Sequence, residues 1–295
     1  MFGIGELAGF SAIETGIENS NYFVTLATDD DELEFVLTIT EDLGFEDQPF
    51  FNELLTRLDR GGLPVPSPVR TLDGMASTIF CGKPAWLFPR LPGSHPETAT
   101  TAACEQIGQL LARIHEGAAG ARYSRDNPYS AAWARDALEQ TQALLDDGDA
   151  ALLARTIEEY AVLESREDLP RGVIHGDLFM DNALFVDDTL TGVIDFYHAC
   201  NDFLVQDLAI TINAWARDAA GELNDALVDA LLDGYGATRE LEPAERESLP
   251  AFLRAGAARF ALTRLLSGEN GAHLKDPDEF LQILRATDQA ASAER

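Results

Sequence analysis

The sequence predicts an α+β fold with two unequal lobes, a small β-rich lobe over residues 1–92 and a larger, mainly helical lobe over residues 93–295. Apolar and polar residues alternate in the first part of the chain, as in strands, whereas apolar residues recur at helical spacing after about Thr100. Between these parts, the segment PGSHPETAT breaks both patterns with two prolines and a glycine. We therefore expect a hinge between the lobes in this segment.

The N-terminal lobe is expected to contain two strand pairs and one helix. NYFVTLAT and LEFVLTIT alternate in hydropathy on either side of an acidic turn at residues 29–32, which predicts a β-hairpin. PFFNELLTRLDRGG has apolar residues at helical spacing and ends in Gly-Gly, which predicts a helix and its stop. After the proline-rich connector PVPSPV, STIFCG and PAWLFPRL predict a second strand pair.

The C-terminal lobe is predicted to be helical with one β-rich interruption. Helical spacing is clear in CEQIGQLLARIHEG, SAAWARDALEQTQALL and AALLARTIEEYAVL. Residues 172–197 instead contain the short apolar runs GVIHGD, ALFV and TGVIDFY, separated by polar turns, which predict strands. Helices are expected to resume directly after this segment and to continue to the C-terminus.

The composition favours a globular protein of the cytoplasm. Of the 295 residues, 46% are hydrophobic, which is enough for a large core. No apolar run approaches the roughly 20 residues that cross a bilayer, and MFGIGELAGF lacks the basic and long apolar regions of a signal peptide. The three cysteines, Cys81, Cys104 and Cys200, are widely scattered, which favours a reducing compartment without a disulfide framework or a metal cluster.

The charge of the chain is strongly negative. It contains 51 acidic and 21 basic residues, for a formal net charge of −30, and Lys83 and Lys275 are the only lysines. Such a chain repels nucleic acid and anionic membranes, so we exclude both as partners. The acidic residues form short clusters that are typical of solvated loops. Their excess fits either adaptation to a salty cytoplasm or simply a highly soluble surface.

One loop contains groups that suit phosphoryl transfer. VIHGDLFMDN places Asp177 and Asn182 directly after a strand, and TGVIDF places Asp195 thirteen residues after Asn182. Transfer from ATP needs a carboxylate that accepts a hydroxyl proton, and hard oxygen ligands for the magnesium ions that bridge the phosphates. The same order of Asp, Asn and strand-borne Asp occurs in the protein-kinase catalytic loop and D-F-G. The alternative is that these are unrelated turn residues. By chance, this spacing would occur in about one chain in a thousand.

Several stretches spread over the whole chain resemble one family. They include GIENSNYFV, PFFNELLTRLDRGGLPVPSPV, VIHGDLFMDNALFV, VIDFYHACNDFLVQDLAITINAW and RFALTRLLS. HGD-x4-N is similar to the aminoglycoside phosphotransferase and choline kinase superfamily, and the ENSNY and DFY-x-ACND strings resemble its homoserine kinases. The resemblance begins abruptly at FGIGEL, where relatives have a leading helix of roughly twenty residues, so we expect an upstream start or the loss of that helix.

The resemblance implies a bilobal protein-kinase-like fold that uses ATP and Mg2+. It implies that Asp177 is the catalytic base and that Asn182 and Asp195 bind magnesium. It also implies that His175 fixes the loop and that Asp207, in QDLA, braces it from the next helix.

Two features depart from the protein-kinase pattern. Thr38 stands where protein kinases have a lysine on the phosphates, so Glu53 on the following helix has no obvious partner. The segment GIENSNY, expected to be the phosphate loop, has one glycine instead of the three of G-x-G-x-x-G. Backbone N–H groups of residues 18–21 could still bind phosphates in a nest. The alternative is that this segment is an ordinary hairpin turn. The ATP-site residues expected by analogy, including the FPRLPG hinge around adenine, are Glu18, Asn19, Ser20, Asn21, Thr38, Phe88 and Leu91.

For the acceptor, the resemblance implies L-homoserine, a zwitterion whose carboxylate suits an arginine and whose ammonium suits oxygen ligands. The candidate contacts are Tyr197, His198, Asp202, Asn213 and Arg264. The expected reaction is ATP-dependent phosphorylation of the homoserine hydroxyl in threonine biosynthesis, by a monomer or a homodimer. The alternatives are a kinase of another small hydroxylated metabolite or aminoglycoside, and a catalytically dead nucleotide-binding protein.

Overall fold

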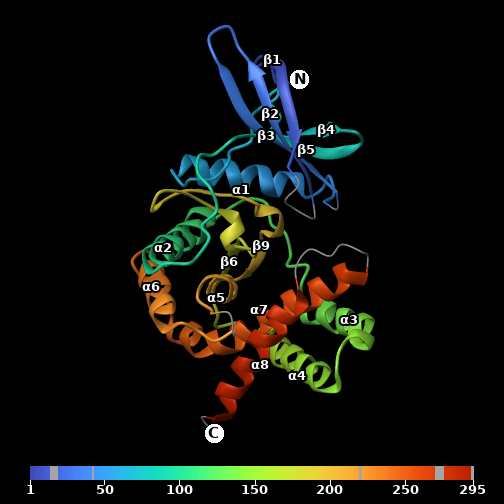
Figure 1. Cartoon of the computed structure of the whole chain (residues 1–295), viewed down its shortest axis with the longest axis vertical. Coiled ribbons are helices and arrows are strands. Elements are labelled where there is room, and N and C mark those ends of the chain that lie inside the picture. Colours follow the sequence, from blue (N-terminus) through green and yellow to red (C-terminus); the bar gives the residue numbers. More distant parts are fainter. Residues whose placement is uncertain (14–18, 42, 219–220, 270–275, 294–295) are drawn as a thin grey trace.

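The N-terminal lobe is a five-stranded antiparallel sheet with the strand order β1-β2-β3-β5-β4 in the computed structural model (Figure 1). The structure describes residues 1–13, 19–41, 43–218, 221–269 and 276–293. Both predicted strand pairs are present, but the edge strand β1 was not predicted, because its mostly exposed residues give no burial alternation. The strands are β1 (Glu6–Ala12), β2 (Asn19–Ala27), β3 (Glu32–Thr40), β4 (Thr78–Phe80) and β5 (Lys83–Pro89).

Helix α1 (Gln48–Arg60) lies between the sheet and the C-terminal lobe (Figure 1). Its apolar residues are buried, and Gly61 follows its last turn, as the sequence predicts. Glu53 of this helix does have partners, which the sequence did not indicate. Its carboxylate accepts hydrogen bonds from the backbone N–H groups of Arg122 (2.8 Å) and Tyr123 (2.9 Å) in the C-terminal lobe. These bonds attach α1 to the larger lobe.

The C-terminal lobe is built around α5, whose sequence LVQDLAITINAW is buried at almost every position. Because no face of α5 meets solvent, its polar residues are buried with the apolar ones. The predicted helix over residues 130–145 ends earlier, at Thr141, and a 3-10 turn follows at Gln142–Leu144. The helices are α2 (Thr101–Ala118), α3 (Ala131–Thr141), α4 (Asp147–Glu164), α5 (Leu204–Trp215), α6 (Asp225–Gly236), α7 (Pro243–Glu269) and α8 (Pro277–Ala293).

Two small antiparallel sheets form the β-rich interruption. β6 (Arg171–Ile174) pairs with β9 (Cys200–Phe203), and β7 (Ala183–Val186) pairs with β8 (Thr189–Val193). The prediction that helices resume directly after residue 197 was wrong, because β9 precedes α5. Four residues without alternation give no local signal, and β9 forms through its pairing with the distant β6. This pairing places the segment after Asp195 alongside the strand that leads into His175.

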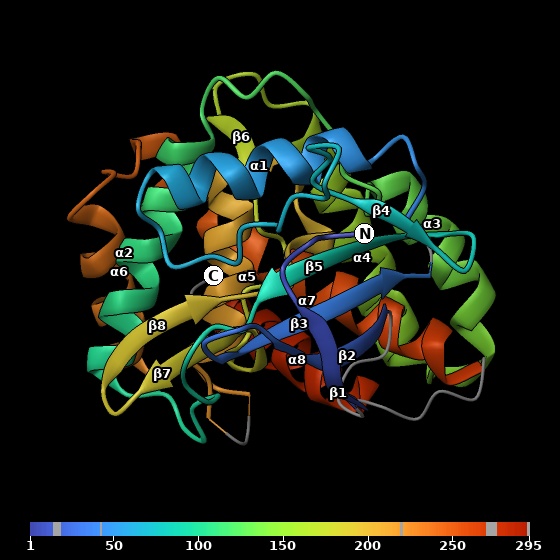
Figure 2. The ribbon, with the colours of Figure 1, turned by 90° about the horizontal axis from the view of Figure 1, so that it is seen from above.

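The linker between the lobes rests on the β7–β8 hairpin, which lies beside the end of β5 (Figure 2). Ser94 exchanges backbone hydrogen bonds with Phe185 (3.0 and 2.9 Å), and Thr191 Oγ1 donates to the Pro92 carbonyl (2.6 Å). Gly93 has φ of +111°, and a Cβ there would lie 2.7 Å from the Phe185 carbonyl oxygen. The linker is therefore held in place, while the boundary at residues 92 and 93 stays a prediction.

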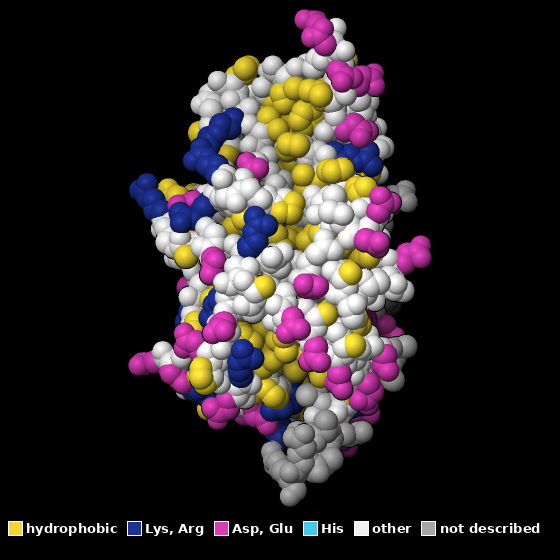
Figure 3. Space-filling model, turned by 90° about the vertical axis from the view of Figure 1, so that its left-hand side faces the viewer, with side chains coloured by type: hydrophobic (Ala, Val, Ile, Leu, Met, Phe, Trp, Pro, Cys, Tyr) yellow, Lys and Arg dark blue, Asp and Glu magenta, His cyan; other side chains and the backbone are white. Residues whose placement is uncertain are grey.

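Acidic side chains are spread over the surface, as Figure 3 shows for one face, in keeping with the solvated clusters expected from the sequence. Within the described part of the chain, no helix is long and apolar enough to cross a membrane.

Candidate active site

The loop at residues 175–182, called the catalytic loop below after its predicted role, brings Asp177 and Asn182 together. It leaves β6 and ends in a 3-10 turn at Met180–Asn182. Asn182 Nδ2 donates to the Asp177 backbone oxygen (2.8 Å) and to the carboxylate oxygen Oδ2 (3.0 Å). Both bonds use the amide nitrogen, so the side-chain amide orients the Asp177 carboxylate. The amide oxygen of Asn182 is at the other end of the group, where it suits a cation.

Asp207 of α5 fixes the first turn of the catalytic loop. Its buried carboxylate accepts hydrogen bonds from the backbone N–H groups of His175 (2.7 Å) and Gly176 (2.8 Å). Gly176 has φ of +75°, a conformation that favours glycine. Burial raises the pKa of Asp207, but the hydrogen bond from His115 and the charges and backbone donors around it outweigh burial, so the pKa is lowered overall. Asp207 is therefore an ionised brace.

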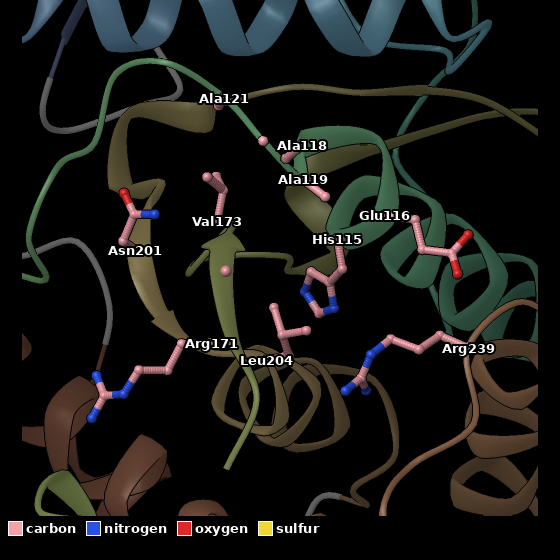
Figure 4. Close-up of a pocket in the computed structure, with 12 residues that line it drawn as sticks. His115, Glu116, Ala118, Ala119, Ala121, Arg171, Val173, Asn201, Leu204 and Arg239 are labelled. Carbon is pink, nitrogen blue, oxygen red and sulfur yellow. The ribbon is translucent and has the colours of Figure 1, made fainter. Parts of the chain in front are cut away.

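His115 connects Asp207 to a cavity lined in part by residues of α2 and β6. His115 Nε2 lies 3.0 Å from Asp207 Oδ2, and Nδ1 lies 2.8 Å from the Tyr235 hydroxyl. The cavity measures about 440 Å³, and Figure 4 shows Leu204 between the side chains of Arg171 and Arg239. None of Asp177, Asn182 and Asp195 lines it. The cavity is therefore separate from the predicted catalytic groups, and no sequence pattern indicated it.

His175 joins the two segments that contain the predicted functional aspartates. His175 Nδ1 accepts from the Asp177 backbone N–H (3.2 Å), and Nε2 donates to the Ile194 carbonyl (3.1 Å). These bonds require a neutral ring with its proton on Nε2. Burial lowers the pKa of His175 to about 4, which keeps the ring neutral. His175 therefore links the Asp177 turn to the residue before Asp195.

We expect His175 to weaken the fold in mild acid. Its pKa is about 4 in the fold and about 6.5 in an unfolded chain, so the unfolded chain binds the proton first as the pH falls. Between about pH 7 and about pH 5, this difference should lower the free energy of unfolding by about 2 kcal/mol. In His175→Gln, the side chain at this position does not titrate, so this part of the pH dependence of the free energy of unfolding should be absent. Urea unfolding of both proteins at both pH values measures it, and equal pH dependences would contradict the expectation.

Asp195 follows β8 at a sharp turn beside Asn182. The Ile194 N–H donates to the Asn182 backbone oxygen (3.0 Å), which holds the strand end against the catalytic loop. Asp195 itself has φ of +63°, a left-handed conformation that aspartate tolerates better than most residues. The chain then reverses through a 3-10 turn at Phe196–His198 into β9. The two segments with Asp177, Asn182 and Asp195 thus meet at one edge.

This donor set fits magnesium. Mg2+ prefers hard oxygen ligands and is usually bound by one or two carboxylates together with substrate phosphates and water. Asn182 Oδ1 and the Asp195 carboxylate are oxygen donors of this kind. Within the described ranges, no group of three or more His, Cys, Asp or Glu residues could hold a metal. A magnesium ion shared with a nucleotide does not need such a cage.

The predicted phosphate nest is not formed by residues 19–21. Asn19, Ser20 and Asn21 begin β2 and pair with β3, so they have strand geometry. Glu18 lies outside the described residues. Thr38 is buried, and its hydroxyl donates to Asn21 Oδ1 (2.7 Å). Thr38, which stands where protein kinases have a lysine, therefore joins β3 to β2 by a side-chain hydrogen bond.

β5 and the linker that follows it contain Lys83, Phe88 and Leu91. Lys83 forms an ion pair with Glu41, whose other oxygen accepts from the Ser20 hydroxyl (2.8 Å). Leu91, in the linker, packs against β7 and β8, where Gly192 leaves room for it: a Cβ at Gly192 would lie 2.9 Å from Leu91 Cδ1. Phe88 is buried in β5. Leu91 is thus the aliphatic surface next to the linker backbone.

Tyr197 connects the Asp195 segment to the N-terminal lobe. Its ring centroid lies 5.9 Å from that of Phe51 and 6.1 Å from that of Trp86. Burial raises the pKa of Tyr197, and its hydroxyl has no hydrogen-bond partner among the described residues. Thr38 lies close by, but the Thr38 proton is donated to Asn21. The ring of Tyr197 therefore belongs to the interface between the lobes.

The other predicted acceptor contacts have partners of their own. Asp202 accepts from Asn127 Nδ2 (2.5 Å) and from the Phe203 N–H (2.8 Å). Asn213 joins α5 to α7, because Nδ2 donates to the Leu253 carbonyl and Oδ1 accepts from Arg217. His198, the next of these candidates, lies three residues after Asp195, and its Nδ1 lies 3.0 Å from the Tyr129 hydroxyl.

Arg264 lies near the start of α8. Its guanidinium donates to the Asp276 carbonyl (2.8 Å) and to Glu279 Oε2 (2.6 Å). The structure thus places Arg264 in an ion pair with Glu279 in which the arginine side chain is only 9% exposed, and its role in acceptor binding stays a prediction without a supporting contact.

Sequence reasoning missed Arg259, which contacts the catalytic loop. Arg259 Nη1 donates to the Gly176 carbonyl (2.5 Å), directly before Asp177. The guanidinium lies over the ring of Tyr129, at 3.9 Å from the centroid, and Tyr129 lies 3.0 Å from His198 Nδ1. The available signal was an arginine in the otherwise apolar run AARFAL, where a charge on a buried helix face needs a reason.

Comparison with known proteins agrees with this geometry. A model of the phosphotransferase enzyme family matches residues 9–241. A homoserine kinase of Azorhizobium caulinodans is 41% identical over 99% of this chain and 92% of that protein. A homoserine kinase of Pseudomonas aeruginosa is 40% identical over 95% of this chain and 89% of that protein.

The fold is similar to a solved structure, the amicoumacin kinase hAmiN in complex with AMP-PNP, Ca2+ and Ami. The TM-score is 0.71 at 16% identity, over 96% of this chain and 88% of that chain. This likeness confirms the predicted bilobal protein-kinase-like fold. Because the family model matches most of the chain and the relatives match nearly all of it, this kinase belongs to the phosphotransferase enzyme family, in the branch that contains these homoserine kinases.

Proposed function

We propose that this kinase transfers the γ-phosphoryl group of ATP to the side-chain hydroxyl of L-homoserine, giving O-phospho-L-homoserine for threonine biosynthesis. The observation that supports it most is the 41% identity to a homoserine kinase over 99% of this chain. The placement of Asp177, Asn182 and Asp195 at one edge of the larger lobe supports phosphoryl transfer as its chemistry.

Asp177 is the proposed base. The acceptor hydroxyl donates its proton to the Asp177 carboxylate, its oxygen bonds to the γ-phosphorus, and the bond from that phosphorus to the bridging oxygen breaks to release ADP. Asn182 orients the carboxylate through Nδ2. Asp207 and His175 fix the turn on either side of it. The braced loop thereby limits the motion of the base before the substrate arrives.

Asn182 and Asp195 are the proposed magnesium ligands, through the amide oxygen and the carboxylate. When bound, Mg2+ supplies positive charge that offsets the charge developing on the phosphates. The proposed adenine site is the linker backbone between Phe88 and Leu91, with Leu91 and Leu184 as aliphatic walls over Gly192.

A coupled assay of ADP release tests the proposal with L-homoserine, choline and kanamycin as alternative acceptors. We expect kcat/KM to be highest for L-homoserine. A preference for choline or kanamycin would overturn the proposed substrate and favour another kinase of this fold. ATP binding without ADP release for any of the three would favour the catalytically dead alternative.

A further inference from the structure

Arg259 is a buried cation without a carboxylate partner among the described residues. It lies near the middle of α7 with only 6% of its surface exposed. Every neighbour from Ala257 to Leu262 is also buried. An unpaired buried charge opposes folding strongly unless other groups compensate it. Packing alone therefore does not explain why an arginine stands at position 259.

The groups around Arg259 satisfy only part of the guanidinium. Nη1 donates to the Gly176 carbonyl at 2.5 Å. The rings of Tyr129 and Phe260 lie 3.9 Å and 4.5 Å from Cζ, which provides cation–π attraction. Nε is buried and has no hydrogen-bond partner among the described residues. Because Nη1 is used by the loop, the edge formed by Nε and Nη2 is the edge suited to a ligand.

The position of Arg259 links it to both functional segments. Gly176 directly precedes the proposed base, Asp177. Tyr129, whose ring lies under the guanidinium, has its hydroxyl oxygen 3.0 Å from Nδ1 of His198. His198 in turn follows Asp195 by three residues. An anion on the Nε edge of Arg259 would therefore lie close to the loops that we assign to proton transfer and to metal binding.

We propose that Arg259 binds the carboxylate of an amino-acid acceptor and so selects amino acids over simple amino alcohols. The Nε and Nη2 donors of arginine match the two oxygens of a carboxylate. The ligand would supply the negative charge that the buried guanidinium lacks. This inference rests on the proposed function, and it assigns to Arg259 the role that the sequence suggested for Arg264.

The test compares L-homoserine with 3-aminopropan-1-ol, which has the same hydroxyl and amine but hydrogen in place of the carboxylate. In Arg259→Met, kcat/KM for L-homoserine should fall roughly 10²- to 10³-fold, mainly through KM, because a buried charge pair is lost. For 3-aminopropan-1-ol the loss should be at least about tenfold smaller, since that acceptor has no carboxylate to bind and is affected only through the bond from Arg259 to the Gly176 carbonyl. Arg259→Lys should recover part of the selectivity through its charge.

Arg254→Met is the matched control, because Arg254 lies on the same helix and pairs with Glu159 instead (2.9 Å). It should keep the parental ratio of the two kcat/KM values. This ratio is measured within one preparation, so a partly unfolded variant does not distort it. Equal losses for both acceptors in Arg259→Met would overturn the inference and leave Arg259 as a support of the loop. A parent without activity on L-homoserine would overturn the proposed function, and this inference with it.

Discussion

Asp177→Asn is expected to lower kcat on L-homoserine by roughly 10²- to 10⁴-fold, the usual contribution of a general base. Asparagine has nearly the same shape but cannot accept the hydroxyl proton. The loop should stay in place, because its braces are backbone bonds to Asp207 and His175. The affinity for ATP should therefore change little, since the base acts mainly in the transition state.

Steady-state kinetics and equilibrium binding of an ATP analogue measure the two effects separately. Asp181→Asn is the control, since Asp181 is an exposed aspartate four residues further along the same loop. It makes the same change of charge away from the proposed base, and we expect near-parental turnover. If Asp177→Asn also keeps near-parental turnover, the assignment of the base is wrong.

Asp195→Asn is expected to raise the Mg2+ concentration needed for half-maximal activity by at least about 10²-fold, since it removes a charged ligand. The fold should be little affected, because asparagine also tolerates the left-handed backbone that Asp195 adopts. Binding of the magnesium–nucleotide complex should weaken in parallel, in contrast to Asp177→Asn. Titration of activity with Mg2+, and calorimetry with an ATP analogue, measure the two quantities.

Asp187→Asn is a close control for this variant. Asp187 lies at the exposed turn of the β7–β8 hairpin and has φ of +51°, so the substitution changes the same charge on a similar backbone. We expect its magnesium dependence to match that of the parent. A shift as large as in Asp195→Asn would indicate a general effect of charge and would contradict metal binding by Asp195.

The catalytic loop could be predicted because its signal is local. Asp177 and Asn182 are five residues apart on one turn, and the strand that delivers Asp195 is readable from its own apolar residues. The acceptor contacts were harder to predict. Asp202 and Asn213 are polar residues near the loop in sequence, but in the fold their polar ends bind Asn127 and Leu253.

For groups that join distant parts of the chain, no sequence signal identified the partner. The bond between Arg259 and Gly176 spans 83 residues, and the bond between His115 and Asp207 spans 92. A buried arginine or histidine looks the same in sequence whether it supports a loop, binds a ligand or lies on the surface. Only the packing of α7 against the catalytic loop and of α2 against α5 distinguishes these cases.

The sequence by itself determined the class of this protein: its two-lobed fold, the loop that contains Asp177 and Asn182, and its family. The fold class and the loop depend on periodicity and spacing, which follow from the geometry of one helix, strand or turn. The family depends on the resemblance of whole stretches such as VIHGDLFMDNALFV. The tertiary structure alone decided that β9 pairs with β6, that α1 attaches to the larger lobe through Glu53, and that Arg259 binds the Gly176 carbonyl. The physical reason is that burial and hydrogen bonding are satisfied over the whole core at once, whereas a local pattern records only near neighbours.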